Sequence, residues 1–287
     1  MRDTTSAATL ALIASLLLAT PAASASGGTA SGHFRKGDSR IEVRHAVAAY
    51  HLETGDPETD DLYVFLSDQP LDPAVIAASF DPDDGAQAQY REREGGFVRI
   101  CLPPTGGECG LYFQRNEPSD SFNSAGYGAL SIETRTDTRI AGRWVLAEPE
   151  DFFGKTYDFD LRFDTAIAPA PGQRLPDDGG EAGAAYKAYA AAVAKGDIAT
   201  LRRMLGESGQ WRFAGDDDAR AKEALKDLRD EQPLAPVVFH ARAIGDHVVL
   251  WVEGTDRDDI KRRGRVQMRR EGDQWVVGER DLDNVSE

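Results

Sequence analysis

The sequence predicts two folded units: an N-terminal all-β antiparallel sandwich or barrel with one short helix, and a C-terminal α+β cone of helices packed on a curved antiparallel sheet. Apolar residues recur with period two through much of residues 34–168, which is typical of half-buried strands. Residues 169–181 contain three prolines and three glycines and therefore read as a linker. Residues 182–287 then begin with helical periodicity, which marks a change of architecture.

The first 25 residues have the pattern of a secretory signal peptide. Arg2 gives a positive start, Ala7–Leu18 form an apolar run, and Ala23-Ser24-Ala25 is a small-residue cleavage site. The run is too short to span a membrane, and a buried N-terminal helix is the alternative. We therefore expect an exported protein, periplasmic or alternatively extracellular, with residues 26–33 as a disordered spacer.

Composition narrows the possible partners. The formal net charge of −16 argues against nucleic acid and against adsorption to anionic lipid. Residues 26–168 hold 13 basic and 25 acidic side chains, net −12, whereas residues 182–287 hold 18 and 20, net −2. The 7 lysines against 26 arginines are typical of a GC-rich bacterial genome. No further run of eighteen apolar residues follows the leader, so the sequence predicts a soluble mature chain without membrane insertion.

The chain has two cysteines, Cys101 and Cys109, on either side of a Pro-Pro and Gly-Gly turn. In an exported protein an even pair at this spacing predicts a disulfide that staples a hairpin between Phe97–Leu102 and Leu111–Phe113. A redox-active pair is the alternative, but the Cys-x-x-Cys spacing is missing. A zinc site would need histidines, and none lies nearby in the sequence.

Strands dominate the predicted N-terminal unit. Residues 155–168 are the clearest example, because aromatic and aliphatic residues alternate there with charged ones. A helix is expected after Asp72, a good N-cap followed by proline at the first helical position, and it should end before Pro82. The other expected strands are Ile41–Ala49, Leu62–Leu66, Phe97–Leu102, Leu111–Gln114, Ala129–Thr134 and Arg139–Ala147.

The C-terminal unit should begin with helices. Residues 182–195 form one apolar stripe, Gly196 is a natural helix stop, and Asp197 caps a second helix. A third helix is expected over 218–230. Glycine–aspartate turns then connect an antiparallel meander. Its expected strands are Pro236–Ala243, His247–Gly254, Gly264–Arg270 and Gln274–Arg280.

This C-terminal pattern resembles the nuclear transport factor 2-like, or SnoaL-like, superfamily over residues 182–282. The matching stretches are AYAAAVAKGDIATLRRML, HVVLWVEGT and RGRVQMRREGDQWVV, with the Lys195-Gly196-Asp197 corner and the strand Gln274–Val277 as markers. The resemblance implies a pocket between a helical hairpin and a curved sheet. Catalytic members place an Asp–His or Asp–Arg pair there, and no such motif is matched here. The N-terminal unit resembles no family.

Few residues suggest chemistry. His240, Glu253 and Arg265 are the candidate catalytic set if the C-terminal pocket is an enzyme site, although ordinary structural roles are favoured. His45 and His51 lie about 20 Å apart along a strand, too far to share a metal. The acidic runs 56–61, 81–84 and 216–218 lack the spacing of a calcium loop. The sequence therefore predicts no cofactor and no metal.

Basic residues gather at one predicted hairpin. Arg262, Arg263 and Arg265 belong to a cluster that a solvated surface would explain. The functional alternative is electrostatic docking of this strand onto the acidic N-terminal unit or onto an anionic partner.

These observations favour a non-enzymatic role. We expect an exported, soluble cell-envelope protein with a binding or structural accessory function, whose partner is a small molecule or an envelope protein. The alternative is a small-molecule hydrolase or isomerase that uses the C-terminal pocket. These classes differ by geometry, because an enzyme needs convergent titratable groups in a concave site.

Overall fold

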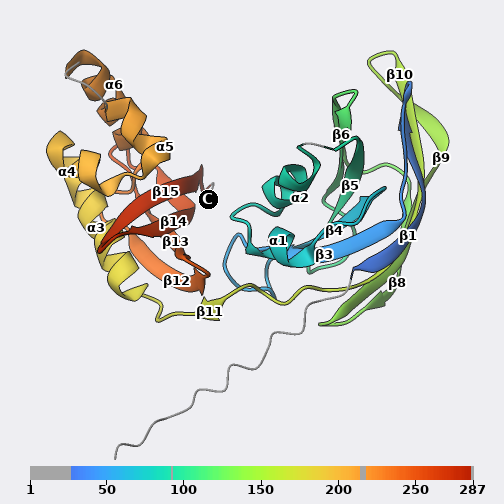
Figure 1. Ribbon diagram of the computed structural model, residues 1–287, viewed down its shortest axis with the longest axis horizontal. Coiled ribbons are helices and arrows are strands. Elements are labelled where there is room, and N and C mark those ends of the chain that lie inside the picture. The colour runs from blue at the N-terminus through green and yellow to red at the C-terminus, as the bar shows by residue number, and fades with distance from the viewer. Residues whose placement is uncertain (1–26, 92, 214–217, 286–287) are drawn as a thin grey trace, which may run out of the picture.

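The chain is mostly β, with 49% strand and 22% helix, and its strands form two antiparallel sheets (Figure 1). The computed structural model describes residues 27–285 except 92 and 214–217, so the predicted signal peptide lies outside the described residues. Within that part of the chain, no helix is long and apolar enough to cross a bilayer.

The N-terminal residues build a curled ten-stranded sheet in the order β7-β6-β5-β4-β3-β1-β10-β9-β8, with β2 paired to β1. Alternation along β10 buries Tyr157, Phe159, Leu161 and Phe163 against one core. The strands are β1 (Gly28–Lys36), β2 (Ser39–Glu42), β3 (His45–His51), β4 (Asp61–Ser67), β5 (Gly95–Leu102), β6 (Gly110–Glu117), β7 (Asp120–Ser124), β8 (Ala129–Arg135), β9 (Arg139–Phe152) and β10 (Lys155–Ala166).

Two helices, α1 (Pro73–Ala78) and α2 (Pro82–Tyr90), cover part of this sheet. Asp72 caps α1 as predicted, because its carboxylate accepts from the backbone N–H of Ala74 at 2.8 Å. The sequence predicts one helix in this region, whereas the structure has two. Asp81 is the N-cap of α2, since its carboxylate accepts from the N–H of Asp83.

The C-terminal residues build a five-stranded sheet in the order β11-β12-β13-β14-β15. Its strands are β11 (Gln173–Arg174), β12 (Val237–Ile244), β13 (His247–Thr255), β14 (Lys261–Glu271) and β15 (Gln274–Asn284). Its helices are α3 (Gly180–Lys195), α4 (Ile198–Met204), α5 (Glu207–Gln210), the 3-10 helix η1 (Trp211–Phe213) and α6 (Asp218–Glu231). These helices lie on one side of the sheet, and the N-terminal residues lie on the other (Figure 1).

The predicted fold class is wrong. The N-terminal part is a curled sheet with two helices, not a sandwich or barrel with one helix, and it is not a separate unit. The C-terminal part is not an open cone, because buried side chains such as Tyr186, Leu201 and Val266 fill the space between helices and sheet. Period two identifies strands, but it does not show what covers each face of a sheet.

The two sheets are joined by a buried contact on the second face of β12–β14. Val249, Trp251 and Ile244 pack there against Leu52, which follows β3. The Trp251 Nε1–H donates to the Leu52 carbonyl at 2.8 Å, and Trp251 is 1% exposed. Exposing these apolar side chains to water would be unfavourable, and the N-terminal residues bury them.

The prediction of a disordered spacer over residues 26–33 is also wrong. From Gly28 onward these residues form β1, in the interior of the ten-stranded sheet. A Cβ on Gly28 would lie 2.3 Å from the Asp164 carbonyl oxygen, and Gly32 has a φ of +110°. The small residues that suggested disorder are therefore required by the close approach of β10. Residues 169–181 are likewise not purely a linker, as the sequence predicted, because β11 lies within them and pairs with β12.

Replacing Trp251 with Phe should lower the free energy of unfolding by about 1–3 kcal/mol, because the Leu52 carbonyl loses its buried donor and a small void remains. Urea unfolding checks this. Trp211, which is 56% exposed, is the matched control, and Trp211→Phe should change stability by less than about 0.5 kcal/mol. Equal effects of the two substitutions would contradict the buried contact.

Candidate functional site

The predicted catalytic residues do not converge. His240, Trp251 and Arg265 are in register across β12–β14, so their side chains share the face turned toward the N-terminal residues. His240 is 6% exposed, its ring meets Trp251 edge-on at 5.0 Å, and burial lowers its pKa. Glu253 is exposed near the end of β13, opposite Arg263. Trp251 separates His240 from Arg265, so the set forms part of a packed contact.

Arg265 is bound on three sides. Its Nη1 donates to the Phe80 carbonyl at 2.8 Å, and its Nη2 donates to Asp281 at 2.9 Å. Nη2 also lies 3.3 Å from Nε2 of His51. Since a guanidinium only donates, Nε2 accepts and the His51 proton sits on Nδ1, 3.5 Å from the carboxylate of Glu53. Arg265 therefore acts as a fixed connection between the two sheets.

Of the three arginines in the docking hypothesis, Arg265 alone has a hydrogen bond to the N-terminal residues within the part of the chain that the structure describes. Arg262 donates to the buried carboxylate of Asp256 at 2.9 Å and to the Asp230 carbonyl. Arg263 lies over the ring of Phe239 at 4.4 Å. Salt-dependent docking by all three stays a prediction.

A cleft of about 240 Å³ runs beside this contact and mixes both charges: Glu53, Thr54, Arg263, Gly264, Arg265, Asp281, Asp283 and Val285 line it. Arg265 is already paired with Asp281, and Arg263 is occupied by Phe239. Both arginines of the cleft thus already interact with other groups of the protein, which makes the cleft a poor anion site.

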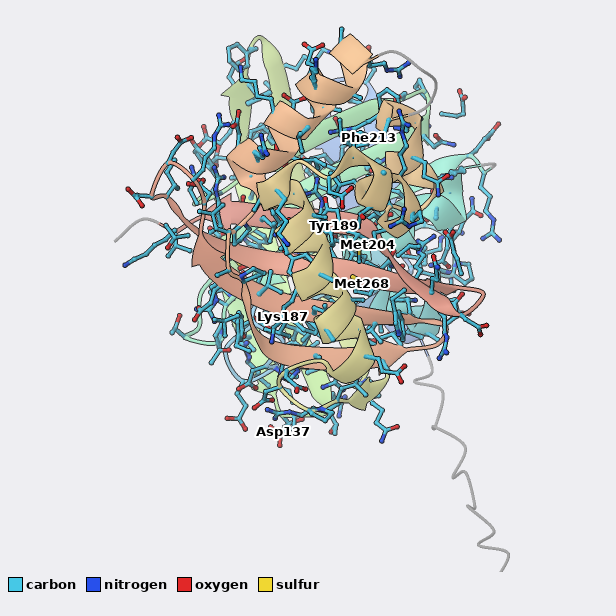
Figure 2. The ribbon with its side chains drawn as sticks, turned by 90° about the vertical axis from the view of Figure 1, so that its left-hand side faces the viewer. Asp137, Lys187, Tyr189, Met204, Phe213 and Met268 are labelled. Atoms are coloured by element: carbon cyan, nitrogen blue, oxygen red, sulfur yellow. A yellow bond between two sulfur atoms is a disulfide. The ribbon has the colours of Figure 1, made fainter. Side chains whose placement is uncertain are left out.

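A second pocket, which we call the arginine pocket, has about 190 Å³ and lies on the helical side of the five-stranded sheet. It is lined by Leu205, Gly209, Arg212, Phe213, Leu228, Gly278 and Arg280. Figure 2 faces this helical layer, with Tyr189 and Phe213 labelled near its centre.

Local structure fixes the walls of the arginine pocket. Asp197 caps α4 by accepting from the Thr200 N–H, and the chain after α4 is pinned to β15 because the Gly206 N–H donates to the Val277 carbonyl at 3.0 Å. A β-bulge in β14–β15 places Arg280 opposite Val266, which is fully buried in the helical core. Arg280 therefore enters the pocket from the sheet.

Two buried donor atoms, one on Arg280 in the pocket wall and one on its neighbour Tyr189, lack a hydrogen-bond partner within the described part of the chain. Arg280 Nη1 and the Tyr189 hydroxyl are both buried without a hydrogen bond among the described residues. The Arg280 guanidinium lies 6.0 Å from the Tyr189 ring centre, and its Nη2 is 4.0 Å from the exposed Glu231. Burial raises the pKa of Tyr189, while the charges of Arg280 and then Arg212 oppose that rise. The hydroxyl is thus a neutral donor near two cations.

The neighbouring tyrosine shows the contrast. Tyr186 stacks on Tyr189 at 6.1 Å, and its hydroxyl accepts from Gln232 Nε2 at 2.8 Å. Buried hydroxyls normally find such partners, so the unpaired Tyr189 hydroxyl and Arg280 Nη1 call for an explanation. Guanidinium and hydroxyl donors suit a carboxylate or phosphate. The lining residues combine two guanidinium groups with apolar side chains, an arrangement that can bind an anion.

Tyr189 lies within the apolar helical stripe predicted over residues 182–195, whereas neither Arg212 nor Arg280 is predicted from the sequence as a site residue. One signal was available for Arg280: it alternates with Leu282 on the inward register of the last strand, where an apolar residue is expected. Arg212 lies in η1, a 3-10 helix of three residues, which is too short to give a periodic signal.

No family model, no curated protein and no solved structure matches the chain. The resemblance to the nuclear transport factor 2-like superfamily therefore stays a prediction.

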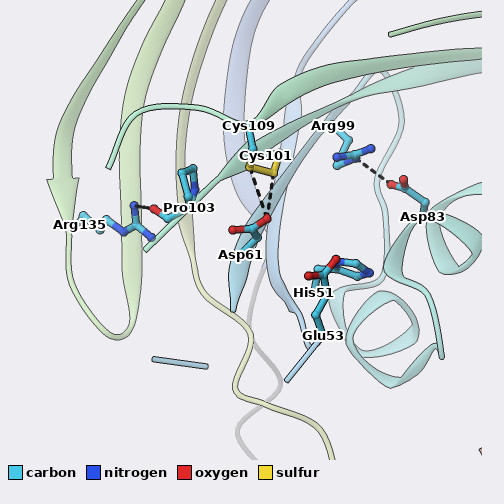
Figure 3. The surroundings of a disulfide bond; sticks show 9 residues. All are labelled: His51, Glu53, Asp61, Asp83, Arg99, Cys101, Pro103, Cys109 and Arg135. Atoms are coloured by element: carbon cyan, nitrogen blue, oxygen red, sulfur yellow. Dashed lines mark hydrogen bonds and ion pairs between the residues drawn. A yellow bond between two sulfur atoms is a disulfide. The ribbon is translucent and has the colours of Figure 1, made fainter. Parts of the chain in front are cut away.

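The predicted disulfide is confirmed. Cys101 on β5 is bonded to Cys109, which immediately precedes β6, and the bond closes the β5–β6 hairpin (Figure 3). The Cys109 N–H donates to the Cys101 carbonyl at 3.0 Å across the same turn. The carboxylate of Asp61 on β4 faces both sulfurs.

His51 should make stability depend on pH. Burial, and then the adjacent Arg265, lower its pKa from 6.5 to about 4. Between these values the unfolded state binds more protons, so the free energy of unfolding should fall as pH drops from about 6.5 to about 4, by roughly 2–3 kcal/mol. Urea unfolding of the wild type and His51→Gln at pH 7 and 4.5 measures the difference.

Asp83 acts in the opposite direction, because burial raises its pKa to about 6, but it is present in both proteins and cancels in the comparison. The His51→Gln protein should show the smaller loss on acidification. The same loss in both proteins would mean that His51 is not the titrating group.

Proposed function

We propose that this chain is an exported, non-enzymatic protein that binds a small organic anion in the arginine pocket. The observation that carries the proposal is the pair of buried, unpartnered donors, Arg280 Nη1 and the Tyr189 hydroxyl, beside Arg212. The leader-like residues 1–25 and the Cys101–Cys109 disulfide support export, since disulfides persist in oxidising compartments.

The energetics favour an anion. Leaving a buried donor unpaired costs about 1–3 kcal/mol, and more when the group is charged. A carboxylate or phosphate oxygen near Arg280 would accept from the free Nη1 and offset the guanidinium charge, which Glu231 does only from 4.0 Å at an exposed position. Such charge-assisted hydrogen bonds are roughly twice as strong as neutral ones.

The size of the pocket limits the ligand. Pockets for drug-sized molecules usually measure about 300–1,000 Å³. At about 190 Å³ the arginine pocket suits an anion of a few heavy atoms, with Leu205, Phe213 and Leu228 supplying apolar contacts. A small organic acid fits these features better than inorganic phosphate, because it uses both the donors and the apolar wall.

The enzymatic alternative has weaker support. His240 and Arg265 lie on the opposite face of the sheet, where His240 lies against Gly55 and Arg265 donates to the Phe80 carbonyl. Glu253 is exposed. These three residues offer no shared concave site at which a reacting group could meet an acid and a base.

Binding can be tested by calorimetric titration with acetate, benzoate, succinate and inorganic phosphate. At least one carboxylate should bind and raise the Tm with concentration, as expected for a ligand of the native state. Arg280→Gln should weaken that binding by about 10-fold or more, because one charge-assisted interaction is worth about 1.5–3 kcal/mol. Tyr189→Phe, which removes only the hydroxyl, should weaken it by about 3–10-fold.

Arg162→Gln is the matched control, since it removes one positive charge from an exposed position on β10. It should bind the carboxylate like the wild type. If no anion of the panel binds at millimolar concentration, or if Arg280→Gln and Arg162→Gln bind equally well, the proposed function is wrong.

A further inference from the structure

We propose that reduction of the disulfide converts Asp61, Cys101 and Cys109 into a three-ligand site for a zinc-class divalent ion. We call this cluster the sulfur site. Asp61 begins β4, Cys101 lies near the end of β5, and Cys109 immediately precedes β6 (Figure 3). The sulfur site shares no residue with the arginine pocket, which lies in the C-terminal residues.

The ligand spacing fits a tetrahedral metal. Asp61 Oδ2 lies 3.4 Å from Cys101 Sγ and 3.5 Å from Cys109 Sγ, and all three ligand atoms lie within 4.8 Å of one another. With Zn–S near 2.3 Å and Zn–O near 2.0–2.2 Å, a tetrahedral site has an O···S edge of about 3.5 Å. Only the two sulfurs must separate, to about 3.8 Å by the same geometry.

The position of the Asp61 carboxylate also favours a bound cation. Among the residues that the structure describes, the two sulfurs are the only groups within hydrogen-bonding distance of its oxygens. Sulfurs joined in a disulfide carry no proton, so they cannot donate to this carboxylate. Two thiols could donate to it, and a divalent cation would bind the oxygen and both sulfurs together.

The backbone holds the ligands while the side chains remain free to turn. Tyr63, two residues after Asp61, pairs with Cys101 across β4–β5, and the Cys109 N–H donates to the Cys101 carbonyl. The intervening loop includes Gly106 and Gly107, around which a Cβ would meet no other atom. The sulfurs can therefore separate by side-chain rotation and a small loop shift, without disturbing the sheet.

The site is accessible from solvent. Cys109 is exposed, whereas Cys101 is 4% exposed. A pocket of about 260 Å³ that includes Cys109, Gly110 and Ser124 opens beside the disulfide. Water can fill the fourth coordination position from this side, and the ion can enter by the same route.

The chemistry balances with a dithiol as reductant. The dithiol gives two electrons and two protons to the Cys101–Cys109 bond, which breaks into two thiols, and the reductant leaves as a cyclic disulfide. On binding one divalent ion the two thiols release two protons, and Asp61 supplies the third ligand. Thiolate donors select zinc-class ions over calcium or magnesium, which prefer oxygen. Occupancy thus follows the redox state of the pair.

Cobalt titration tests the sulfur site. The intact protein, reduced and freed of reductant under argon, is titrated with Co²⁺ and the thiolate-to-cobalt absorption is recorded. The reduced wild type should bind one ion per chain, and excess Zn²⁺ should displace it. The oxidised protein and the Cys109→Ser variant should give no such absorption.

Asp61→Asn keeps both thiols and should weaken cobalt binding by about tenfold or more, because a charged ligand is lost. Asp137→Asn, at an exposed turn between β8 and β9, is the matched control and should bind like the reduced wild type. Absence of the absorption in the reduced wild type, or equal affinities of Asp61→Asn and Asp137→Asn, would overturn the proposal. Circular dichroism of each variant confirms that it is folded.

Discussion

The burial of Trp251 against Leu52 is the constraint on which the arrangement of the two sheets depends. One face of the five-stranded sheet is apolar and covered by α3–α6. The other face carries polar side chains beside Val249 and Trp251, and these two would be exposed without the N-terminal residues. The hydrogen bond from Trp251 to the Leu52 carbonyl fixes this contact, and Arg265 adds bonds to Phe80 and His51. One consequence is functional, because the contact occupies the side chains that could otherwise have formed a site on that face.

Local patterns in the sequence predicted local structure well. The alternation along β10, the Asp72 and Asp197 caps and the Cys101–Cys109 bond all followed from spacing and residue type. The fold class did not follow, because the sequence of β12–β14 does not show what covers the second face of this sheet. Gly28 and Gly32 illustrate the same problem, since small residues are typical both of disorder and of strands that approach closely.

The candidate sites differ in how fully their polar groups are paired. Arg265 is satisfied by protein acceptors, so it stabilises a contact. Arg280 Nη1 and the Tyr189 hydroxyl have no hydrogen-bond partner among the described residues, and Asp61 faces sulfurs that cannot donate. These cases cannot be distinguished from the sequence, because an arginine on a strand gives the same pattern whether its hydrogen-bond acceptor comes from the protein or from a ligand. Pairing depends on tertiary neighbours such as Phe80, which lies far from Arg265 in the chain.

Scanning calorimetry of the intact oxidised chain tests most directly whether the Trp251–Leu52 contact makes the two sheets one cooperative unit. A single transition should appear, with a calorimetric enthalpy equal to the van't Hoff enthalpy, because separating the two sheets exposes Trp251 and its apolar neighbours and leaves the Leu52 carbonyl without its donor. Two resolved transitions, one for residues 28–166 and one for residues 180–284, would contradict this.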